Sequence, residues 1–281
     1  MKWNDTGRSS NIEDRRGGGG IGRVGMGLGG TAILLVLSLL FGRNLFDDVG
    51  AAPTVDASNG QLAPADSARE EPEVRFVSFV LDDAQQTWAN ILPKYGAQYH
   101  DAKLVLFRDA TETGCGVGQT AMGPFYCPND EKVYIDLGFY DELKSKFGAS
   151  GDFAQAYVIA HELGHHVQHL LGTDAQVRRA EQNDPSAANQ YSVRLELQAD
   201  CFAGVWANST KQRDKLDPGD IEEGINAAAS VGDDRILAQS GRRVNADNFT
   251  HGSSQQRVSW FRKGFESGDP RACDTFGATG G

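Results

Sequence analysis

The chain has 281 residues, of which 38 are acidic and 27 basic, so its formal net charge at pH 7 is −11. This acidic balance, with no basic aromatic patch along the sequence, excludes nucleic acid as the expected partner. No internal repeat is present, and residues 76–281 are enough for a single domain with its own core.

The amino-terminal region predicts a membrane anchor. Residues 1–23 are polar and Gly-rich, and we expect them to form a cytoplasmic tail without a fold of its own. Residues 24–42 carry no charge and end in a strongly apolar run, a length that just spans the hydrocarbon core of a bilayer. The basic residues before this run are Lys2, Arg8, Arg15, Arg16 and Arg23. By the positive-inside rule, they place the amino terminus in the cytoplasm. We therefore expect a single-pass membrane protein whose carboxyl-terminal part lies outside the cytoplasm; a signal peptide cleaved near residues 49–51 is the alternative.

Residues 43–75 are rich in Ala, Asp, Glu and Pro, a composition typical of a disordered tether. After it, Asp82 or Asp83 can begin a helix that runs to about Tyr99. Strands are predicted at residues 103–107, 125–127 and 133–136, of which the last two form a hairpin. Two helices are predicted further along the chain, at residues 217–231 and 253–265. We place the exposed edge of this small sheet at residues 133–136.

Residues 153–171 predict a helix with an apolar back and a front of histidines. His161 and His165 are four residues apart, so they lie on one face, one turn apart, and can bind one metal ion. Glu162 lies beside them, where it can take a proton from a water that the metal activates. This HExxH pattern is typical of zinc peptidases.

A catalytic zinc needs a third protein ligand, and Glu196 is the best candidate. Residues 192–207 are apolar almost all round and predict a buried helix, yet Glu196 and Asp200 lie one turn apart on the face that also carries Ala203 and Ala207. Buried carboxylates are costly unless they are paired or bound to metal. We therefore assign Glu196 to the metal, and Asp200 to the second ring N–H of a ligand histidine.

Other arrangements of these residues remain open. Glu196 could instead form a buried ion pair with Arg194, and Asp174 or His169 could supply the third ligand. His169 is a weak candidate because the helical rise places it about 12 Å along the axis from His161.

These motifs resemble those of the neutral zinc metallopeptidases of bacterial inner membranes, gluzincin-type proteins with HExxH and a downstream ExxxD. The resemblance rests on residues 161–168 (HELGHHVQ) and 196–201 (ELQADC), and extends to residues 11–17, 123–128 and 268–273. It covers nearly the whole chain and implies peptidase chemistry without naming a substrate. Together with the predicted anchor, it implies an inner-membrane protein whose catalytic part is periplasmic. We expect an α+β fold, in which a zincin-like domain of a small sheet and the HExxH helix follows one transmembrane helix.

The four cysteines predict two disulfides, because an even, sparse count is typical of an exported domain. Cys115 and Cys127 are close in sequence and flank a Gly-rich loop, so we pair them, which leaves Cys201 with Cys273. A free, buried Cys201 is the alternative. No CxxC pair occurs, so we do not expect zinc on the cysteines.

The predicted function is the hydrolysis of peptide bonds in a peptide or protein substrate, with one catalytic zinc and Glu162 as general base. His251 precedes an expected helix and is the candidate second donor to the oxyanion, ahead of His100 and Tyr191; a surface or capping role for His251 is the alternative. We assign His166 to the fold. Two other functions keep the same ligands: a membrane-tethered zinc-binding scaffold or chaperone-like module without turnover, and a cell-wall amide hydrolase.

Overall fold

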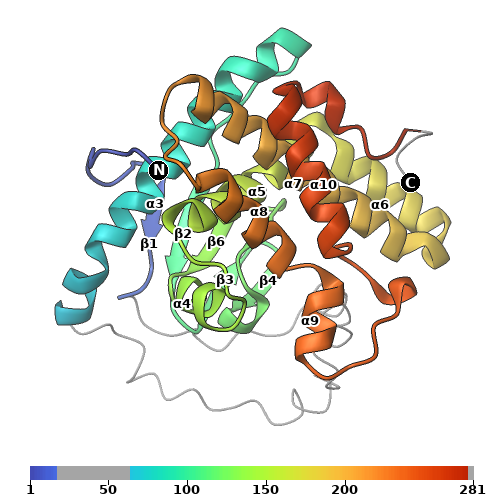
Figure 1. Cartoon of the computed structure of the whole chain (residues 1–281), viewed down its shortest axis with the longest axis horizontal. Coiled ribbons are helices and arrows are strands. Elements are labelled where there is room, and N and C mark those ends of the chain that lie inside the picture. The colour runs from blue at the N-terminus through green and yellow to red at the C-terminus, as the bar shows by residue number, and fades with distance from the viewer. Residues whose placement is uncertain (18–63, 278–281) are drawn as a thin grey trace.

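The computed structural model describes residues 1–17 and 64–277 and has the expected α+β composition (Figure 1). Short 3-10 turns at Leu92–Tyr95 and Pro270–Cys273 accompany the main elements. In chain order these are β1 (Ile12–Asp14), α3 (Pro64–Ile91), β2 (Lys103–Phe107), β3 (Ala110–Thr113), β4 (Gly116–Gln119), β5 (Phe125–Cys127), β6 (Lys132–Asp136), α4 (Gly138–Ser145), α5 (Asp152–Leu171), α6 (Thr173–Asn183), α7 (Ala188–Gln212), α8 (Asp220–Ser230), α9 (Asp233–Gln239) and α10 (Ser254–Ser267).

The main sheet has the strand order β1-β2-β6-β5. β1, β2 and β6 run parallel, whereas β5 is antiparallel to β6 and forms the predicted hairpin with it. The expected edge at residues 133–136 is wrong, because β6 is hydrogen-bonded on both sides and the edge strands are β1 and β5. The run Val133, Tyr134 and Ile135 is fully buried, which is typical of an interior strand.

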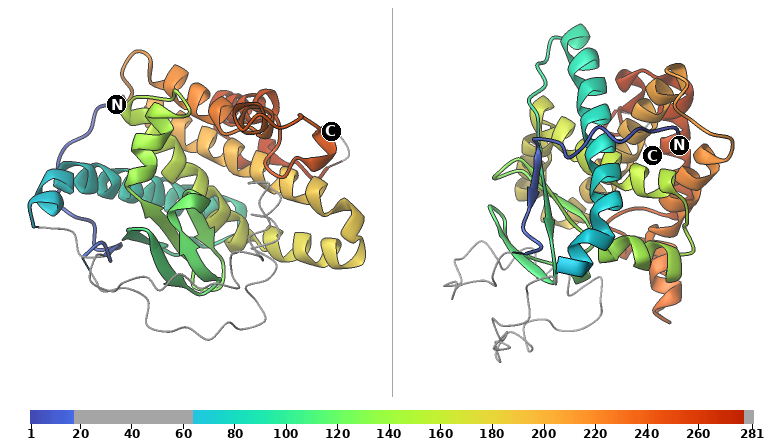
Figure 2. Two further views of the ribbon diagram at one scale, coloured as in Figure 1. Left: turned by 90° about the horizontal axis from the view of Figure 1, so that it is seen from below. Right: turned by 90° about the vertical axis from the view of Figure 1, so that its left-hand side faces the viewer.

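Helix α5 is the centre of the domain. It contacts β5 and β6 of the sheet as well as α3, α7 and α8, and most of its side chains are buried. Figure 2 shows the strands on one side of the molecule and α7, α8 and α10 on the other. The expected helices at 153–171, 192–207, 217–231 and 253–265 correspond to α5, α7, α8 and α10.

Helix α3 begins well before the predicted start at Asp82 or Asp83, so residues 64–75 are helical rather than part of a disordered tether. Asp83 lies in the middle of this helix and is buried. Its carboxylate accepts a hydrogen bond of 3.0 Å from the Trp206 indole N–H and pairs with Arg213 and with Lys215 at 2.7 Å. Residues 43–63 of the expected tether lie outside the described residues.

Residues 1–17 belong to the fold and do not form the separate tail expected for residues 1–23. Strand β1 is parallel to β2, with Ile12 beside Leu104 (the blue strand in Figure 2). Arg16 is buried between Asp14, at 2.6 Å, and Glu70, at 2.7 Å. Residues 24–42, the predicted transmembrane helix, lie outside the described residues; among the helices that are described, none is long and apolar enough to cross a bilayer.

Both predicted disulfide pairings are confirmed. Cys115, in the loop of the β3–β4 hairpin, is joined to Cys127 in the edge strand β5. Cys201 in α7 is joined to Cys273, which ends the 3-10 turn Pro270–Cys273. The second bridge therefore attaches the carboxyl-terminal segment directly beside Asp200.

Candidate metal centre

The two helices that carry the predicted ligands, α5 and α7, pack with their backbones close together. Gly164 has no side chain at the contact, and a Cβ built there would lie 3.0 Å from the Cα of Ala199. Ala203 is fully buried one turn further along α7. Small residues on both helices thus allow the histidines of α5 to face the carboxylates of α7, as expected from Ala203 and Ala207.

The structure brings His161, His165 and Glu196 together. His161 Nε2 lies 3.2 Å from Glu196 Oε2, and His165 Nε2 lies 3.5 Å from Glu196 Oε1. One ligand atom from each residue falls within 4.8 Å of the others. Two imidazole nitrogens and a carboxylate, with a fourth position left for water, are the donors of a catalytic zinc site, so these residues fit zinc.

The alternative ligands lie elsewhere. His169 Nδ1 contacts Asp174 at 2.9 Å, so these two side chains pair with each other. His166 is fully buried, with Nδ1 2.9 Å from the Tyr126 hydroxyl and Nε2 2.6 Å from the His100 carbonyl oxygen. As predicted, His166 supports the fold, because it connects α5 to β5 and to the segment before β2.

A hydrogen-bond acceptor orients each ligand histidine. Asp200 Oδ1 accepts the Nδ1–H of His161 at 2.9 Å, the role predicted for this carboxylate. Gln168 Oε1 accepts the Nδ1–H of His165 at 2.8 Å, and its amide donates 2.7 Å to the Leu195 carbonyl oxygen. Both rings therefore present Nε2 to the centre. Gln168 was not predicted as a site residue, although its place three residues after His165 puts it on the same helix face.

A second missed residue is Arg257 of α10, whose guanidinium is buried against Asp200. It contacts Asp200 through both Nε, at 2.8 Å, and Nη2, at 3.0 Å. Glu196 contacts His161 and His165 in place of the ion pair with Arg194 that the sequence left open.

Negative charge dominates the surroundings of the two histidines. Burial disfavours the charged form of His161, but Asp200 and a hydrogen bond to Glu196 outweigh it and raise the pKa of His161 to about 10. Burial would raise the pKa of Glu196, yet the charges of His251 and His165 hold that pKa well below its usual 4.5. Burial raises the pKa of Glu162, against the opposing charges of His161 and His165. A centre that attracts protons so strongly also favours a metal cation in their place.

His251 lies in the loop between α9 and α10. Its Nδ1 is 3.2 Å from Asp233 Oδ1, and Asp233 Oδ2 accepts three backbone N–H groups of this loop, from Thr250, His251 and Gly252, at 2.7, 2.7 and 3.0 Å. The loop lies against α7 near Glu196, because a Cβ on Gly252, the residue after His251, would lie 3.3 Å from the side chains of both Val193 and Leu197. Capping of α10 falls to Ser253, whose hydroxyl accepts the Gln256 N–H, and not to His251.

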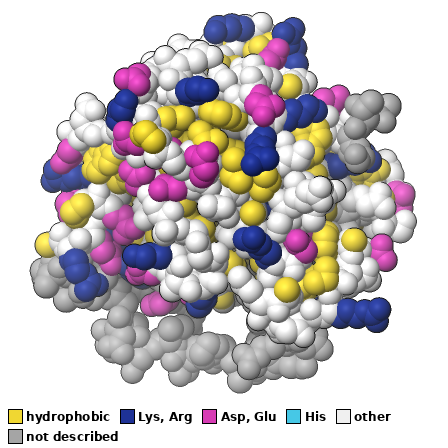
Figure 3. All heavy atoms as spheres, viewed as in Figure 1, with side chains coloured by type: hydrophobic (Ala, Val, Ile, Leu, Met, Phe, Trp, Pro, Cys, Tyr) yellow, Lys and Arg dark blue, Asp and Glu magenta, His cyan; other side chains and the backbone are white. Residues whose placement is uncertain are grey.

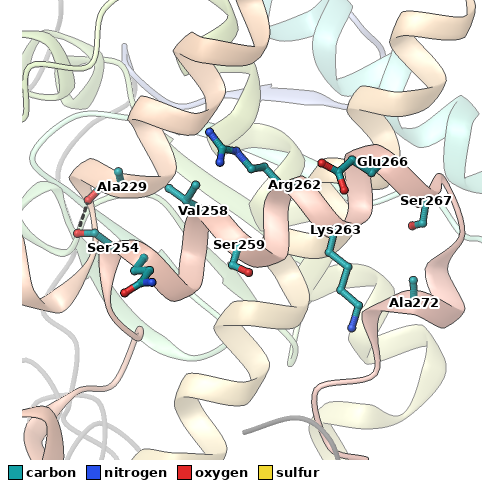
Figure 4. Close-up of a pocket in the computed structure, with 10 residues that line it drawn as sticks. Ala229, Ser254, Val258, Ser259, Arg262, Lys263, Glu266, Ser267 and Ala272 are labelled. Carbon is teal, nitrogen blue, oxygen red and sulfur yellow. Dashed lines mark hydrogen bonds between the residues drawn. The ribbon is translucent and has the colours of Figure 1, made fainter.

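A shallow groove of about 1000 Å³ follows the outer face of α10 and contains none of these residues. Its lining includes Ser254, Val258, Arg262 and Glu266 of α10 (Figure 4). On the side shown in Figure 3, acidic and basic side chains alternate with apolar ones. The residues that line the groove include no cluster of metal ligands.

Proteins similar to this chain occur in several bacteria. The chain is 50% identical over 285 residues to the uncharacterized protein YpfJ of Escherichia coli K12, with 99% of each chain covered. It is 46% identical over 202 residues to the uncharacterized proteins Mb2605 of Mycobacterium bovis and Rv2575 of Mycobacterium tuberculosis, covering 68% of this chain and 66% of theirs. No solved structure matches. The family described as "Putative neutral zinc metallopeptidase" matches residues 1–276, and the chain belongs to this family.

Proposed function

We propose that this protein is a zinc-dependent peptidase that hydrolyses peptide bonds at the centre formed by His161, His165 and Glu196. The observation that carries the proposal is the convergence of two Nε2 atoms on the two oxygens of one carboxylate, at 3.2 and 3.5 Å, with Glu162 next to the first ligand. Such a donor set, beside an extra buried carboxylate, suits metal-assisted hydrolysis.

Each residue has a role in this proposal. A zinc ion held there would polarise the scissile carbonyl and lower the pKa of a bound water to about 7. Glu162 is buried and its pKa is raised, so its carboxylate is suited to accept a proton and later to return it to the leaving amine. His251 would donate from Nε2 to the oxyanion, since Asp233 engages its Nδ1.

An extended peptide is the substrate that the surroundings favour. β5 is an edge strand, antiparallel to its neighbour, and contacts α5, the helix of the histidines. An edge strand can hold an extended peptide by main-chain hydrogen bonds. Tyr126 of β5 reaches His166, one residue after the ligand His165, which fixes the strand beside the centre.

The proposal is tested on the purified full-length chain by measuring bound metal and cleavage of an unfolded protein. Wild type is expected to bind one equivalent of zinc and to cleave. Glu162→Gln should keep the metal and lose cleavage, whereas Glu196→Ala should bind zinc weakly. Cleavage unchanged by Glu162→Gln would overturn the mechanism, zinc without turnover would favour a scaffold, and cleavage of muropeptides alone would favour a cell-wall amide hydrolase.

A further inference from the structure

Arg257 is a buried cation that the proposed chemistry does not use. It comes from α10, which packs on α7 through two glycines: a Cβ on Gly264 would lie 1.9 Å from the Cys201 carbonyl oxygen, and one on Gly204 would lie 2.1 Å from the Phe261 carbonyl oxygen. This backbone contact delivers Arg257, which is 3% exposed, to the side of α7 that carries Asp200. A charge so deeply buried is costly unless it is fully paired.

The pairing of Arg257 is directed at the metal centre. Its Nε and Nη2 grip the two oxygens of Asp200 at 2.8 and 3.0 Å, and Nη1 donates 3.2 Å to the Val231 carbonyl oxygen. Nη2 also lies 3.2 Å from the Tyr157 hydroxyl, which itself donates to Asp200. Its distances to the ligands themselves are longer, 3.4 Å to His161 Nδ1 and 3.8 Å to Glu196 Oε2, so Asp200 is its main partner. A two-pronged Arg–carboxylate contact fixes the plane of the carboxylate as well as its position.

We propose that Arg257 is a positioning residue of the metal centre, acting through Asp200; this inference rests on the zinc site of the proposed function. By fixing Asp200, it holds the oxygen that accepts the Nδ1–H of His161, and so aims His161 Nε2 at Glu196. It also balances charge, because a divalent cation and one guanidinium together neutralise the carboxylates of Glu162, Glu196 and Asp200. Without Arg257, Asp200 would be a buried anion held through its Oδ1 alone, by the Tyr157 hydroxyl and the His161 ring.

The test measures zinc affinity by competition with a chelator, and the visible spectrum of the Co²⁺-substituted protein. Arg257→Gln is expected to weaken zinc binding by about 10- to 100-fold and to alter the spectrum, as loss of outer-shell partners does, with partial rescue in Arg257→Lys. Phe261→Leu is the matched control, because Phe261 lies one turn further along α10 and packs on Tyr157 without a polar contact to the centre. It should lower the free energy of unfolding and leave the zinc affinity unchanged.

Several outcomes would overturn the proposal. If wild type binds zinc and folded Arg257→Gln binds it within twofold of wild type, or if Phe261→Leu weakens binding equally, Arg257 only supports packing. Wild type without zinc would refute the proposed function itself. If Arg257→Gln does not fold, the double variant with Asp200→Asn removes both buried charges; it should bind zinc as Asp200→Asn alone does, because Arg257 acts through Asp200. A further loss in the double variant would contradict that route.

A different observation carries a second inference. β1 is an integral strand: the Leu104 N–H donates 2.8 Å to the Asn11 carbonyl oxygen, and the Arg15 N–H donates 2.7 Å to that of Leu106. Among the basic side chains that predicted a cytoplasmic tail, those within residues 1–17 form ion pairs, as Lys2–Asp214, Arg8–Glu71, Arg15–Glu13 and Arg16–Glu70.

We infer that residues 1–17 and 64–277 lie on the same side of any membrane that this protein contacts. A single crossing between them would separate β1 from β2. In the described part of the chain the four cysteines are all in disulfides, so the native protein offers no free thiol there. Thr6→Cys and Lys144→Cys, both at exposed positions, would each add one thiol that reports the side of the membrane on which its residue lies. Labelled in intact cells with a membrane-impermeant maleimide, both should react or both should be protected. Labelling of only one would overturn the inference.

Discussion

Gly164 and Ala199 hold the two ligand-bearing helices in backbone contact. A Cβ on Gly164 would lie 3.0 Å from both the Cα and the carbonyl oxygen of Ala199, closer than ordinary van der Waals contact. Gly164 precedes His165 directly, and Ala199 precedes Asp200. The spacing of the metal ligands therefore depends on the absence of one methyl group.

Gly164→Ala is expected to destabilise the protein and to weaken zinc binding. Alanine would favour the helix by about 1 kcal/mol, but overpacking costs about 1–3 kcal/mol, and the atoms in the way are backbone atoms that cannot rotate aside. The free energy of unfolding in urea and the zinc affinity should both fall. Gly17→Ala is the control, since nothing lies within 4 Å of its Cβ position. A Gly164→Ala protein as stable as wild type would show that the helices can separate freely.

Much of the centre could be predicted from the sequence because helix geometry relates its parts. His161 and His165 are one turn apart, and so are Glu196 and Asp200, whose burial in an apolar helix required a partner. Arg257 could not be predicted, because no local pattern relates α10 to Asp200. Only the packing of Gly204 and Gly264, far apart in sequence, brings them together.

The fold was predicted best where strands and helices show their own periodicity, as in β2, the β5–β6 hairpin and α5. β1 and the start of α3 were missed because both are polar and charged. Their charges are paired only in the folded domain, where Arg16 forms ion pairs with its neighbour Asp14 and with Glu70, which is distant in sequence. The same arginine counted as a topogenic charge in the sequence, which explains why the predicted tail was wrong.

His251→Ala is expected to lower kcat for peptide cleavage by about 10²- to 10³-fold while the zinc affinity stays the same, the usual cost of losing one oxyanion donor. Asp233→Asn should have a smaller effect, because Asn keeps an oxygen for the backbone N–H groups of the loop. Steady-state kinetics and zinc titration check both variants. His100→Ala is the control, since only the main-chain carbonyl of His100 is used. Full activity in His251→Ala would remove His251 from the mechanism.

Gln168→Leu is expected to weaken zinc binding by about 10- to 100-fold, because His165 loses the acceptor that fixes its ring. It also leaves the Leu195 carbonyl oxygen without the Gln168 amide, so the free energy of unfolding should fall by about 1–3 kcal/mol. Gln198→Leu breaks the same chain of hydrogen bonds one step away from His165. It should destabilise the protein with little effect on zinc, and an equal loss of zinc in both variants would contradict an orienting role for Gln168.

The stability of the metal-free protein should depend on pH through His161. Its pKa rises from an ordinary value of 6.5 to about 10 in the folded protein, so its stabilisation is fully present below pH 6.5 and is lost as pH rises toward 10. The lowered pKa values of Glu196 and Asp200 act in the opposite direction, since their stabilisation is lost under acid conditions. In a chelator, the free energy of unfolding should therefore be greatest between about pH 5 and 6.5.

Zinc should reverse the alkaline part of this dependence. The metal must displace the proton from His161, so its binding strengthens as pH rises, and the gap in melting temperature between loaded and chelated protein should widen from pH 6 to 9. His161→Gln removes the group with the pKa near 10 and should reduce the alkaline fall of the chelated protein, while the raised pKa values of His165 and His251 keep part of it. Parallel pH profiles for wild type and His161→Gln would show that the carboxylates around this histidine do not hold its proton, and would weaken the case that the centre is built to hold a cation.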